Sequence, residues 1–299
     1  MTALPAPGTT ERFALPVGVI GAGRLGTALA GALAAAGYTR ITIAARSELH
    51  AREAATSLGV EASTVPALVH ESTLVFLAVP DRAIPELVGS LPWLPGQGAV
   101  HCSGAVGLDA LAAAVERGAV PGCLHPLQTF PGLAVTGDRE ACAALFRGIA
   151  CGVEAPPPLG DLLRGLANDL GARSIDLAGV DRALYHAAAV LVSNDVVALA
   201  AAAARAWALA GLPPGEAREA LAPLLLASAA NAARLPPAEA LTGPVARGDV
   251  ATVGRHLDAL ARDADLSAVY RALARELLRL DLGLAPEVRA ALEALLRGT

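Results

Sequence analysis

The sequence contains no lysine, so arginine supplies all 23 basic side chains of its 299 residues. Schiff-base catalysis, a P-loop lysine and a lysine general acid are excluded, because arginine cannot replace a titrating ammonium group. The net charge is -5 and there is no basic run, so the clustered arginine or lysine that nucleic-acid phosphates require is missing. We therefore expect no nucleic-acid partner.

Aromatic residues make up only 3% of the chain and charged residues 17%, while the hydrophobic share of 54% is inflated by alanine. This composition favours tightly packed helices over disorder. No C-x-x-C pair occurs, and the N-terminus lacks a charged region followed by an apolar segment, so reduced thiols and a cytoplasmic location are expected. The cysteines concerned are Cys102, Cys123, Cys142 and Cys151.

One segment, residues 187–212, is apolar enough to resemble a membrane span. Asn194, Asp195 and Arg205 interrupt it, and alanine is only weakly apolar. We interpret the segment as a long buried helix and expect no membrane partner.

The order of the secondary-structure signals predicts two domains, which is the usual outcome at this length. In the first part, short β-branched runs alternate with helical stretches, which predicts an α/β Rossmann domain with a mostly parallel sheet over residues 1–178. From residue 179 to residue 299 the strand signals stop, which predicts an all-α domain whose first helix spans 181–210. The strands are expected at 13–20, 41–45, 73–79, 99–103, 118–124, 149–153 and 173–177.

A glycine turn follows the first predicted strand and opens a helix. Its G-x-G-x-x-G pattern runs from Gly21 through Gly23 to Gly26 and includes Arg24 and Leu25. Gly21 permits the tight turn, Gly23 lets a pyrophosphate approach the backbone, and Gly26 lets helix and sheet pack closely. In this strand-turn-helix context the motif predicts a dinucleotide site.

The end of the second predicted strand indicates which dinucleotide is bound. NAD-binding versions carry an acidic residue there, whereas this chain has Arg46 and Ser47. Arginine beside a hydroxyl attracts a 2′-phosphate, so NADP(H) is favoured over NAD(H), although Arg46 could be an ordinary exposed side chain.

Two later strands end in polar or turn residues at the carboxyl edge of the sheet, where ligands bind in open α/β folds. We expect these residues to flank the nicotinamide half of the cofactor. They are Val79, Pro80, Asp81, Ser103 and Gly104.

Together with the glycine turn, the segments 79–81, 101–104 and 125–130 resemble an uncharacterised family of Rossmann-like proteins. Its second domain is an all-helical domain of unknown function, which Tyr185-His186 and the segment 242–249 resemble. More distantly, the chain is similar to pyrroline-5-carboxylate reductase, ketopantoate reductase, and the 6-phosphogluconate and hydroxyisobutyrate dehydrogenases. The resemblance implies a 6-phosphogluconate dehydrogenase-like helical domain, hydride transfer in a cleft between the domains, and homodimers joined through the helical half.

The chain departs from the hydroxyacid branch of these relatives at one position. In that branch a lysine and, one helical turn later, an asparagine work together on a long helix. Asn194 matches the asparagine, but Val190 stands where the lysine would be. The mechanism of that branch therefore does not carry over intact, and Asn194 is expected to orient substrate or to stabilise an oxyanion.

His186 and His125 are the candidate catalytic acids. A reductase needs a proton donor or an electrostatic partner for the developing charge, and histidine titrates near neutral pH. On one helix His186, Ser193 and Asn194 would share a face, and His125 ends a predicted strand. Each histidine could instead be structural and bonded to the backbone.

The candidates for binding substrate are Ser193, Gln128, Thr242 and Arg247. Arg247 lies in a glycine and proline loop between helices and could pair with a substrate carboxylate. A contact with Asp249, or capping of the next helix by Asp249, is the alternative.

His101, Cys102, Cys123 and His125 fit no zinc spacing, and strand alternation should send several of them to opposite faces, so no metal is expected. The sequence thus predicts an NADP(H)-dependent oxidoreductase that reduces a small carboxylate-bearing ketone or imine. A non-catalytic NADP(H) sensor and a dehydrogenase acting on a hydroxy acid are the alternatives.

Overall fold

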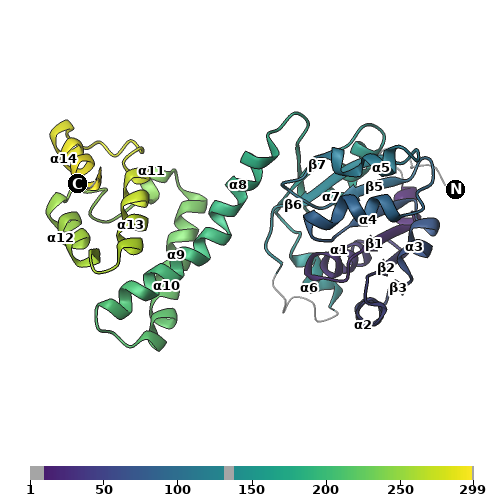
Figure 1. Cartoon of the computed structure of the whole chain (residues 1–299), viewed down its shortest axis with the longest axis horizontal. Coiled ribbons are helices and arrows are strands. Elements are labelled where there is room, and N and C mark those ends of the chain that lie inside the picture. The colour runs from purple at the N-terminus through teal and green to yellow at the C-terminus, as the bar shows by residue number, and fades with distance from the viewer. Residues whose placement is uncertain (1–9, 131–137, 298–299) are drawn as a thin grey trace. The chain divides into compact units, whose positions relative to one another are not determined.

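The computed structural model describes residues 10–130 and 138–297. Contacts between Cα atoms divide the chain into two compact units, Met1–Leu191 and Val192–Thr299, which we call the sheet unit and the helical unit (Figure 1). The boundary expected after residue 178 falls between the last strand and helix α8 (Arg182–Val192). All of α8 except its last residue, Val192, therefore counts with the sheet unit.

The sheet unit contains one sheet of eight strands in the order β3-β2-β1-β4-β5-β6-β7-β8. Neighbouring strands are parallel except for the antiparallel pair β6 and β7, so the expected mostly parallel α/β fold is confirmed. The strands are β1 (Val17–Ile20), β2 (Ile41–Ala44), β3 (Glu61–Ala62), β4 (Leu74–Leu77), β5 (Gly98–His101), β6 (Val120–Pro126), β7 (Ala150–Glu154) and β8 (Arg173–Asp176).

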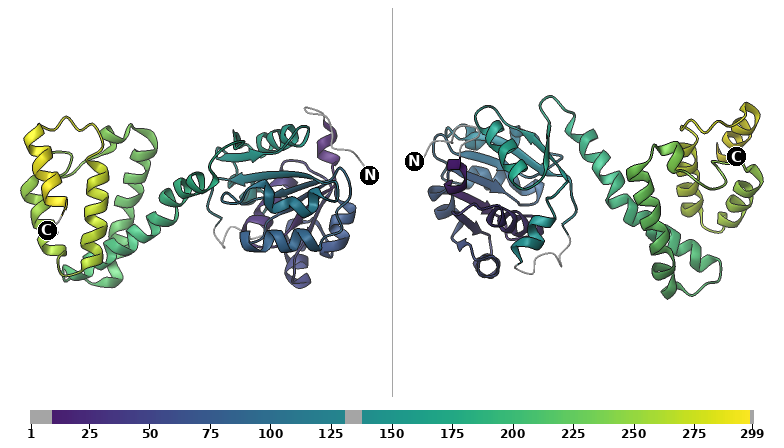
Figure 2. Two further views of the ribbon diagram at one scale, coloured as in Figure 1. Left: turned by 45° about the horizontal axis from the view of Figure 1, so that its top comes forward. Right: turned by 180° about the vertical axis from the view of Figure 1, so that it is seen from behind.

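Helices cover both faces of this sheet, as the views in Figure 2 show. Two separate hydrophobic clusters fill the space between the helices and the sheet, one of them around α1 and α7 and the other around α3, α4 and α5. The helices are η1 (Thr10–Ala14), α1 (Arg24–Ala35), α2 (Glu48–Leu58), α3 (Val65–Glu71), η2 (Asp81–Ala83), α4 (Ile84–Ser90), η3 (Leu108–Leu111), α5 (Ala112–Val115), α6 (Arg139–Ala144) and α7 (Leu159–Asp169).

Burial of the central strands explains their continuous apolar sequences. All four residues of β1 and all four of β4 are buried, which is typical of parallel strands covered on both faces. The two residues of β3 are exposed, and this short strand carries no apolar pattern from which it could have been predicted.

The helical unit contains only helices within the residues that the structure describes. Val253, Leu257, Leu292 and Leu296 form the centre of its own hydrophobic cluster. Its helices are α9 (Asn194–Leu209), η5 (Pro214–Glu216), α10 (Ala217–Arg234), α11 (Pro237–Ala240), α12 (Val250–Leu260), α13 (Ala264–Leu277) and α14 (Pro286–Arg297).

Two expectations about the long apolar segment are wrong. The helix expected over 181–210 is interrupted at Ser193, whose φ of -121° and ψ of -77° lie outside helical values. Arg182–Leu209 is the one described helical segment that is long and apolar enough to span a membrane. Only 6% of its most apolar stretch of 18 residues is buried. The chain alone therefore does not bury this segment.

Candidate active site in the sheet unit

The glycine turn between β1 and α1 has the geometry that a pyrophosphate site requires. Gly21 has a φ of 120°, and a side chain on Gly21 or Gly26 would overlap backbone atoms of the turn and of Ala78. A Cβ on Gly23 would meet no atom within 4 Å. Gly21 and Gly26 therefore fix the turn, whereas Gly23 leaves open space beside the backbone.

Helix α1 presents its N-terminus at this open space. Its N-cap residue is Gly23, and no side chain caps the helix in the described part of the chain. The first backbone N–H groups and the positive end of the helix dipole are thus available to an anion. The turn and the helix together fit the diphosphate of a dinucleotide.

The residues expected to distinguish NADP(H) from NAD(H) lie directly after β2. Arg46 is exposed, and its backbone precedes the N-cap of α2. The Ser47 hydroxyl accepts a hydrogen bond from the His50 N–H at 3.4 Å, so it caps α2. A guanidinium beside a helix N-terminus is a suitable setting for a phosphate group.

At the carboxyl edge, the two later strand ends differ in accessibility. Pro80 and Asp81 are exposed and begin the short helix η2. Ser103 is buried, and its hydroxyl accepts hydrogen bonds from the N–H groups of Ala105 and Val106, both at 3.1 Å. The Ser103 hydroxyl therefore closes its own turn.

Residues of three neighbouring strands meet on one face of the sheet beside this edge. His101 of β5 is paired in register with Cys123 of β6, and Cys123 is paired with Glu154 of β7. His125 follows Cys123 by two residues, so it points to the same face. The expectation that strand alternation separates these residues is wrong for His101, Cys123 and His125.

These residues nevertheless do not form a metal site by geometry. Throughout residues 10–130 and 138–297, no group of three or more histidine, cysteine, aspartate or glutamate side chains is arranged to hold a metal ion. The Cys123 thiol donates to the Ser103 carbonyl oxygen at 3.4 Å, and burial raises the pKa of this thiol to about 11.

Helix α8 places three side chains over this face. Arg182 bonds Glu154 at 2.5 Å and approaches the Cys123 sulfur at 3.5 Å, which fixes the start of the helix on β6 and β7. The Tyr185 hydroxyl lies 2.9 Å from Nδ1 of His125. His186 lies beside the same histidine, with 6.3 Å between the ring centroids. The structure thus brings the two predicted histidines together.

Glycines make room for this cluster. A Cβ on Gly104 would lie 2.6–2.9 Å from Cε1, Nε2 and Nδ1 of His125, so the imidazole rests against the turn that follows β5. A Cβ on Gly152, the partner of His125 in β7, would lie 2.7 Å from the Tyr185 hydroxyl. Both glycines are therefore needed for the observed positions of the rings.

The electrostatic setting keeps both strand histidines neutral. Burial lowers the pKa of His125 from its ordinary value to about 4, and the charges of His186 and Arg182 act in the same direction. Burial likewise lowers the pKa of His101 to about 4, with Arg182 contributing. At neutral pH His125 is thus an uncharged imidazole, which differs from the near-neutral titration expected of a catalytic acid.

His101 is an unusual member of the cluster. Its Nδ1 accepts from the Ser103 N–H at 3.3 Å, which leaves the proton on Nε2. His101 is fully buried, and its Nε2 forms no hydrogen bond. Among the described residues it is the one buried side-chain nitrogen or oxygen atom without a partner.

Sequence reasoning assigned no role in the site to Arg182, Tyr185 or Glu154, although Tyr185 belongs to a segment that carries the family resemblance. Arg182, Tyr185 and His186 have the i, i+3, i+4 spacing of one helix face, which could have indicated that they act together. Their partners in β6 and β7 are distant in the sequence, and no local pattern points to those pairings.

Four other predicted residues, Ser193, Asn194, Thr242 and Arg247, lie in the helical unit. Asn194 is exposed and accepts from the Ser193 hydroxyl at 3.0 Å. Thr242 and Arg247 are exposed in the loop before α12. Asp249 caps α12 by accepting from the Thr252 N–H at 2.9 Å, which confirms the capping alternative for that residue.

Gln128, the remaining predicted substrate residue, lies after β6 in the sheet unit. It is exposed, and its side-chain oxygen accepts from the Thr129 N–H at 2.8 Å. The structure does not join it to the histidine cluster by any hydrogen bond between described residues.

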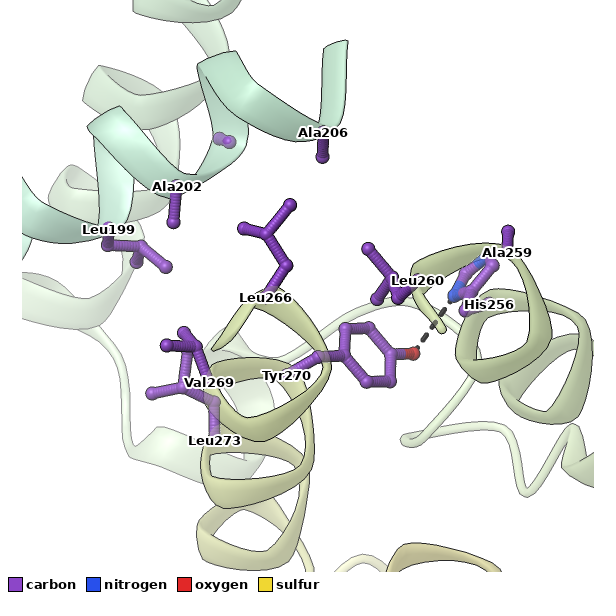
Figure 3. Close-up of a pocket in the computed structure, with 11 residues that line it drawn as sticks. Leu199, Ala202, Ala206, His256, Ala259, Leu260, Leu266, Val269, Tyr270 and Leu273 are labelled. Atoms are coloured by element: carbon purple, nitrogen blue, oxygen red, sulfur yellow. Dashed lines mark hydrogen bonds between the residues drawn. The ribbon is translucent and has the colours of Figure 1, made fainter. Parts of the chain in front are cut away.

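The helical unit has an apolar cavity of its own, with a volume of about 420 Å³ (Figure 3). Alanines and leucines of α9, α12 and α13 line it, and its polar groups are the Tyr270 hydroxyl and Nδ1 of His256, 2.9 Å apart. The Tyr185 hydroxyl and Nδ1 of His125 are also 2.9 Å apart, but the pair in the helical unit has no glycine turn beside it.

Comparison with protein families gives two matches. A model of a Rossmann-like domain matches residues 1–126, and a model of a domain of unknown function, DUF2520, matches residues 149–277. These matches confirm the family resemblance found in the sequence. No curated protein matches the chain.

Solved structures share the fold. The “putative NADP oxidoreductase BF3122” of Bacteroides fragilis is 29% identical, with 89% of this chain and 98% of that chain covered and a TM-score of 0.68. The 1-pyrroline-5-carboxylate reductase of Streptococcus pyogenes is 19% identical, with 90% and 100% covered and a TM-score of 0.61. A reductive aminase of Aspergillus terreus in complex with NADPH and ethyl-5-oxohexanoate is 18% identical, with 95% and 93% covered and a TM-score of 0.59.

Proposed function

We propose that this chain, which combines a Rossmann-like domain with a DUF2520 domain, is an NADP(H)-dependent oxidoreductase that reduces a small ketone or imine bearing a carboxylate. The observation that carries the proposal is the turn at Gly21, Gly23 and Gly26, with open space beside Gly23 and an uncapped α1 behind it. The structural neighbours support the same class, since they include an NADP oxidoreductase and a reductive aminase in complex with NADPH.

The preference for NADP(H) rests on the end of β2. A carboxylate there would bind the ribose hydroxyls of NAD(H), and this chain has the exposed Arg46 instead. The guanidinium and the N-terminus of α2 both favour a 2′-phosphate.

The bound cofactor would supply the hydride, and the histidine cluster would manage the charge that develops on the substrate. When a carbonyl carbon accepts hydride, the π electrons move to oxygen, which then needs a hydrogen-bond donor and finally a proton. His125 and His186 lie side by side to provide these groups. The roles of Asn194, Ser193, Gln128, Thr242 and Arg247 toward substrate stay predictions.

We also propose that two copies of the chain associate through the helical unit. The side chains of Val197 and Leu224 are 71% and 66% exposed, and they line an apolar groove between α9 and α10 of about 570 Å³. A surface of this kind is usually covered by another protein. A second copy would supply the burial that the single chain does not give to α9.

Oxidation of NADPH in the presence of a panel of keto acids, cyclic imines and aldehydes tests the proposed reaction. Loss of NADPH absorbance that depends on one of these compounds is expected. Tight NADPH binding without turnover across the panel would favour a cofactor sensor, the function suggested by the absence of lysine. Turnover only of hydroxy acids with NADP⁺ would show that the protein is a dehydrogenase that oxidises its substrate.

A further inference from the structure

Tyr185 of α8 holds His125 by a hydrogen bond from outside the sheet. Its hydroxyl lies 2.9 Å from Nδ1, and the two rings meet edge to face with centroids 5.5 Å apart and an interplanar angle of 77°. The other side of the imidazole rests against Gly104, in the turn after β5. The ring of His125 is therefore fixed between α8 and the sheet.

The hydrogen bond determines which nitrogen of His125 carries the proton. Burial lowers the pKa of His125 to about 4 and raises that of Tyr185 to about 12, so both groups are neutral at pH 7. A phenol O–H is a better donor than a neutral imidazole N–H, and an imidazole nitrogen is a better acceptor than a phenol oxygen. The hydroxyl therefore donates to Nδ1, and the proton of the imidazole resides on Nε2.

His125 lies beside the edge of the sheet where the cofactor is expected. A Cβ on Gly104, in the turn after β5, would lie 2.6–2.9 Å from Cε1, Nε2 and Nδ1 of His125, which places the imidazole at the edge where the nicotinamide half is expected. Nδ1 is hydrogen-bonded to Tyr185, so Nε2 is the ring nitrogen left to bind a ligand there. A neutral N–H at that place is a hydrogen-bond donor and not a base.

We propose that Tyr185 is a positioning residue that holds His125 in the Nε2–H form, so that His125 donates a hydrogen bond to the oxygen or nitrogen of a substrate as the substrate accepts hydride. This inference rests on the proposed function. In the step, the hydride adds to the carbon of the C=O or C=N bond with its two electrons, and the π pair moves to the heteroatom. Nε2–H stabilises the charge there, and the proton that completes the product comes from His186, which lies beside His125.

The neighbouring charges agree with a neutral donor. Arg182, held by Glu154, and His186 both disfavour a positive charge on His125, and Asp81 is the nearby group that favours one. An imidazolium acid would have to form against the first two groups, whereas a neutral N–H is compatible with all of them.

Nitrogen-15 NMR of the histidines tests the assignment directly, because a protonated ring nitrogen resonates well upfield of a bare one. In the wild-type protein at pH 7 we expect the proton of His125 on Nε2. In Tyr185→Phe, which keeps the ring but removes the hydroxyl, we expect a mixture of both tautomers. A proton found on Nδ1 in the wild-type protein would overturn the proposal even if the variant does not fold.

The kinetic arm uses NADPH and the best substrate of the panel. Tyr185→Phe is expected to lower kcat on the order of 10- to 100-fold and to leave the Kd for NADPH unchanged. The fall in kcat is smaller than for loss of the imidazole, because His125 is still present but is no longer held in one tautomer. Tyr270→Phe removes the hydroxyl of the matching pair with His256 in the helical unit and is the control.

The outcomes separate the two proposals. A Tyr185→Phe variant with wild-type kcat, or one whose kcat falls while the tautomer of His125 is unchanged, contradicts the positioning role. A wild-type protein that turns over no substrate contradicts the proposed function, while the NMR result still decides the state of His125.

Discussion

At the scale of single residues, Gly23 allows cofactor binding to be separated from folding. A methyl group at this position would meet no atom of the protein within 4 Å. Gly23→Ala should therefore keep its melting temperature while the methyl group occupies the space of the pyrophosphate. We expect NADPH affinity to fall about 10- to 100-fold, which corresponds to about 1.4–2.8 kcal/mol.

Gly89→Ala is the matched control, because a Cβ on this residue of α4 also meets open space but lies away from the turn. Calorimetric titration of both variants with NADPH measures the difference. Equal affinities in Gly23→Ala and Gly89→Ala would remove the pyrophosphate from the glycine turn.

The buried histidines predict a fall in stability at acidic pH. The pKa of His101 is lowered to about 4, so between pH 6.5 and pH 4 the unfolded chain binds a proton that the folded protein does not. Neutral His101 therefore contributes its full share of the folding stability above its ordinary pKa of 6.5. This share is lost as the pH falls from 6.5 to 4. Unfolding free energy should therefore drop by about 2–3 kcal/mol for this residue between pH 7 and pH 4.5.

Urea unfolding of the wild-type protein and of His101→Gln at the two pH values checks this contribution. The variant is expected to lose less stability on acidification. The same loss in both proteins would show that His101 is not the group responsible.

At the scale of helices and strands, the sequence predicted the elements whose apolar pattern is continuous. The strands from β1 to β8 were expected close to their observed positions, with β3 missed because Glu61 and Ala62 are exposed. The break at Ser193 was also missed, since it separates two stretches with the same alanine-rich composition. The glycine turn could be recognised locally, whereas Tyr185 meets a partner 60 residues away in the sequence.

Helix α8 depends on Arg182 for its attachment to the sheet. The Arg182 side chain is 10% exposed and that of Glu154 is 25% exposed. Arg182→Met leaves this carboxylate without its partner, so we expect a loss of about 2 kcal/mol in unfolding free energy. Removing the positive charge should also raise the pKa of His125.

Arg205→Met provides the comparison, because Arg205 is 53% exposed and pairs with Asp263 at 3.5 Å. An exposed pair of this kind contributes less than about 1 kcal/mol. Equal losses in the two variants, measured by urea unfolding at pH 7, would contradict the anchoring role of Arg182.

At the scale of the whole molecule, the exposed apolar surface of α9 and α10 predicts association. Val197→Asp combined with Leu224→Asp places two charges in the groove between these helices and should convert a dimer into monomers in sedimentation experiments. Leu49→Asp, at a 63% exposed leucine of the sheet unit, should leave the dimer intact. A wild-type protein that sediments as a monomer, or that partitions into lipid vesicles, would contradict the proposed dimer.

Above all, we infer that the sheet unit binds NADP(H) through its glycine turn and Arg46. Calorimetric titration of the wild-type protein and of Arg46→Ala with NADPH and then NADH tests it most directly, with Arg40→Ala as a control for an exposed arginine at the opposite end of β2. Tight NADPH binding, weak NADH binding, and a selective loss of NADPH affinity of about 10- to 100-fold in Arg46→Ala are the expected results. Failure of the wild-type protein to bind either dinucleotide would contradict the account, and equal weakening of both in Arg46→Ala would contradict the role of Arg46.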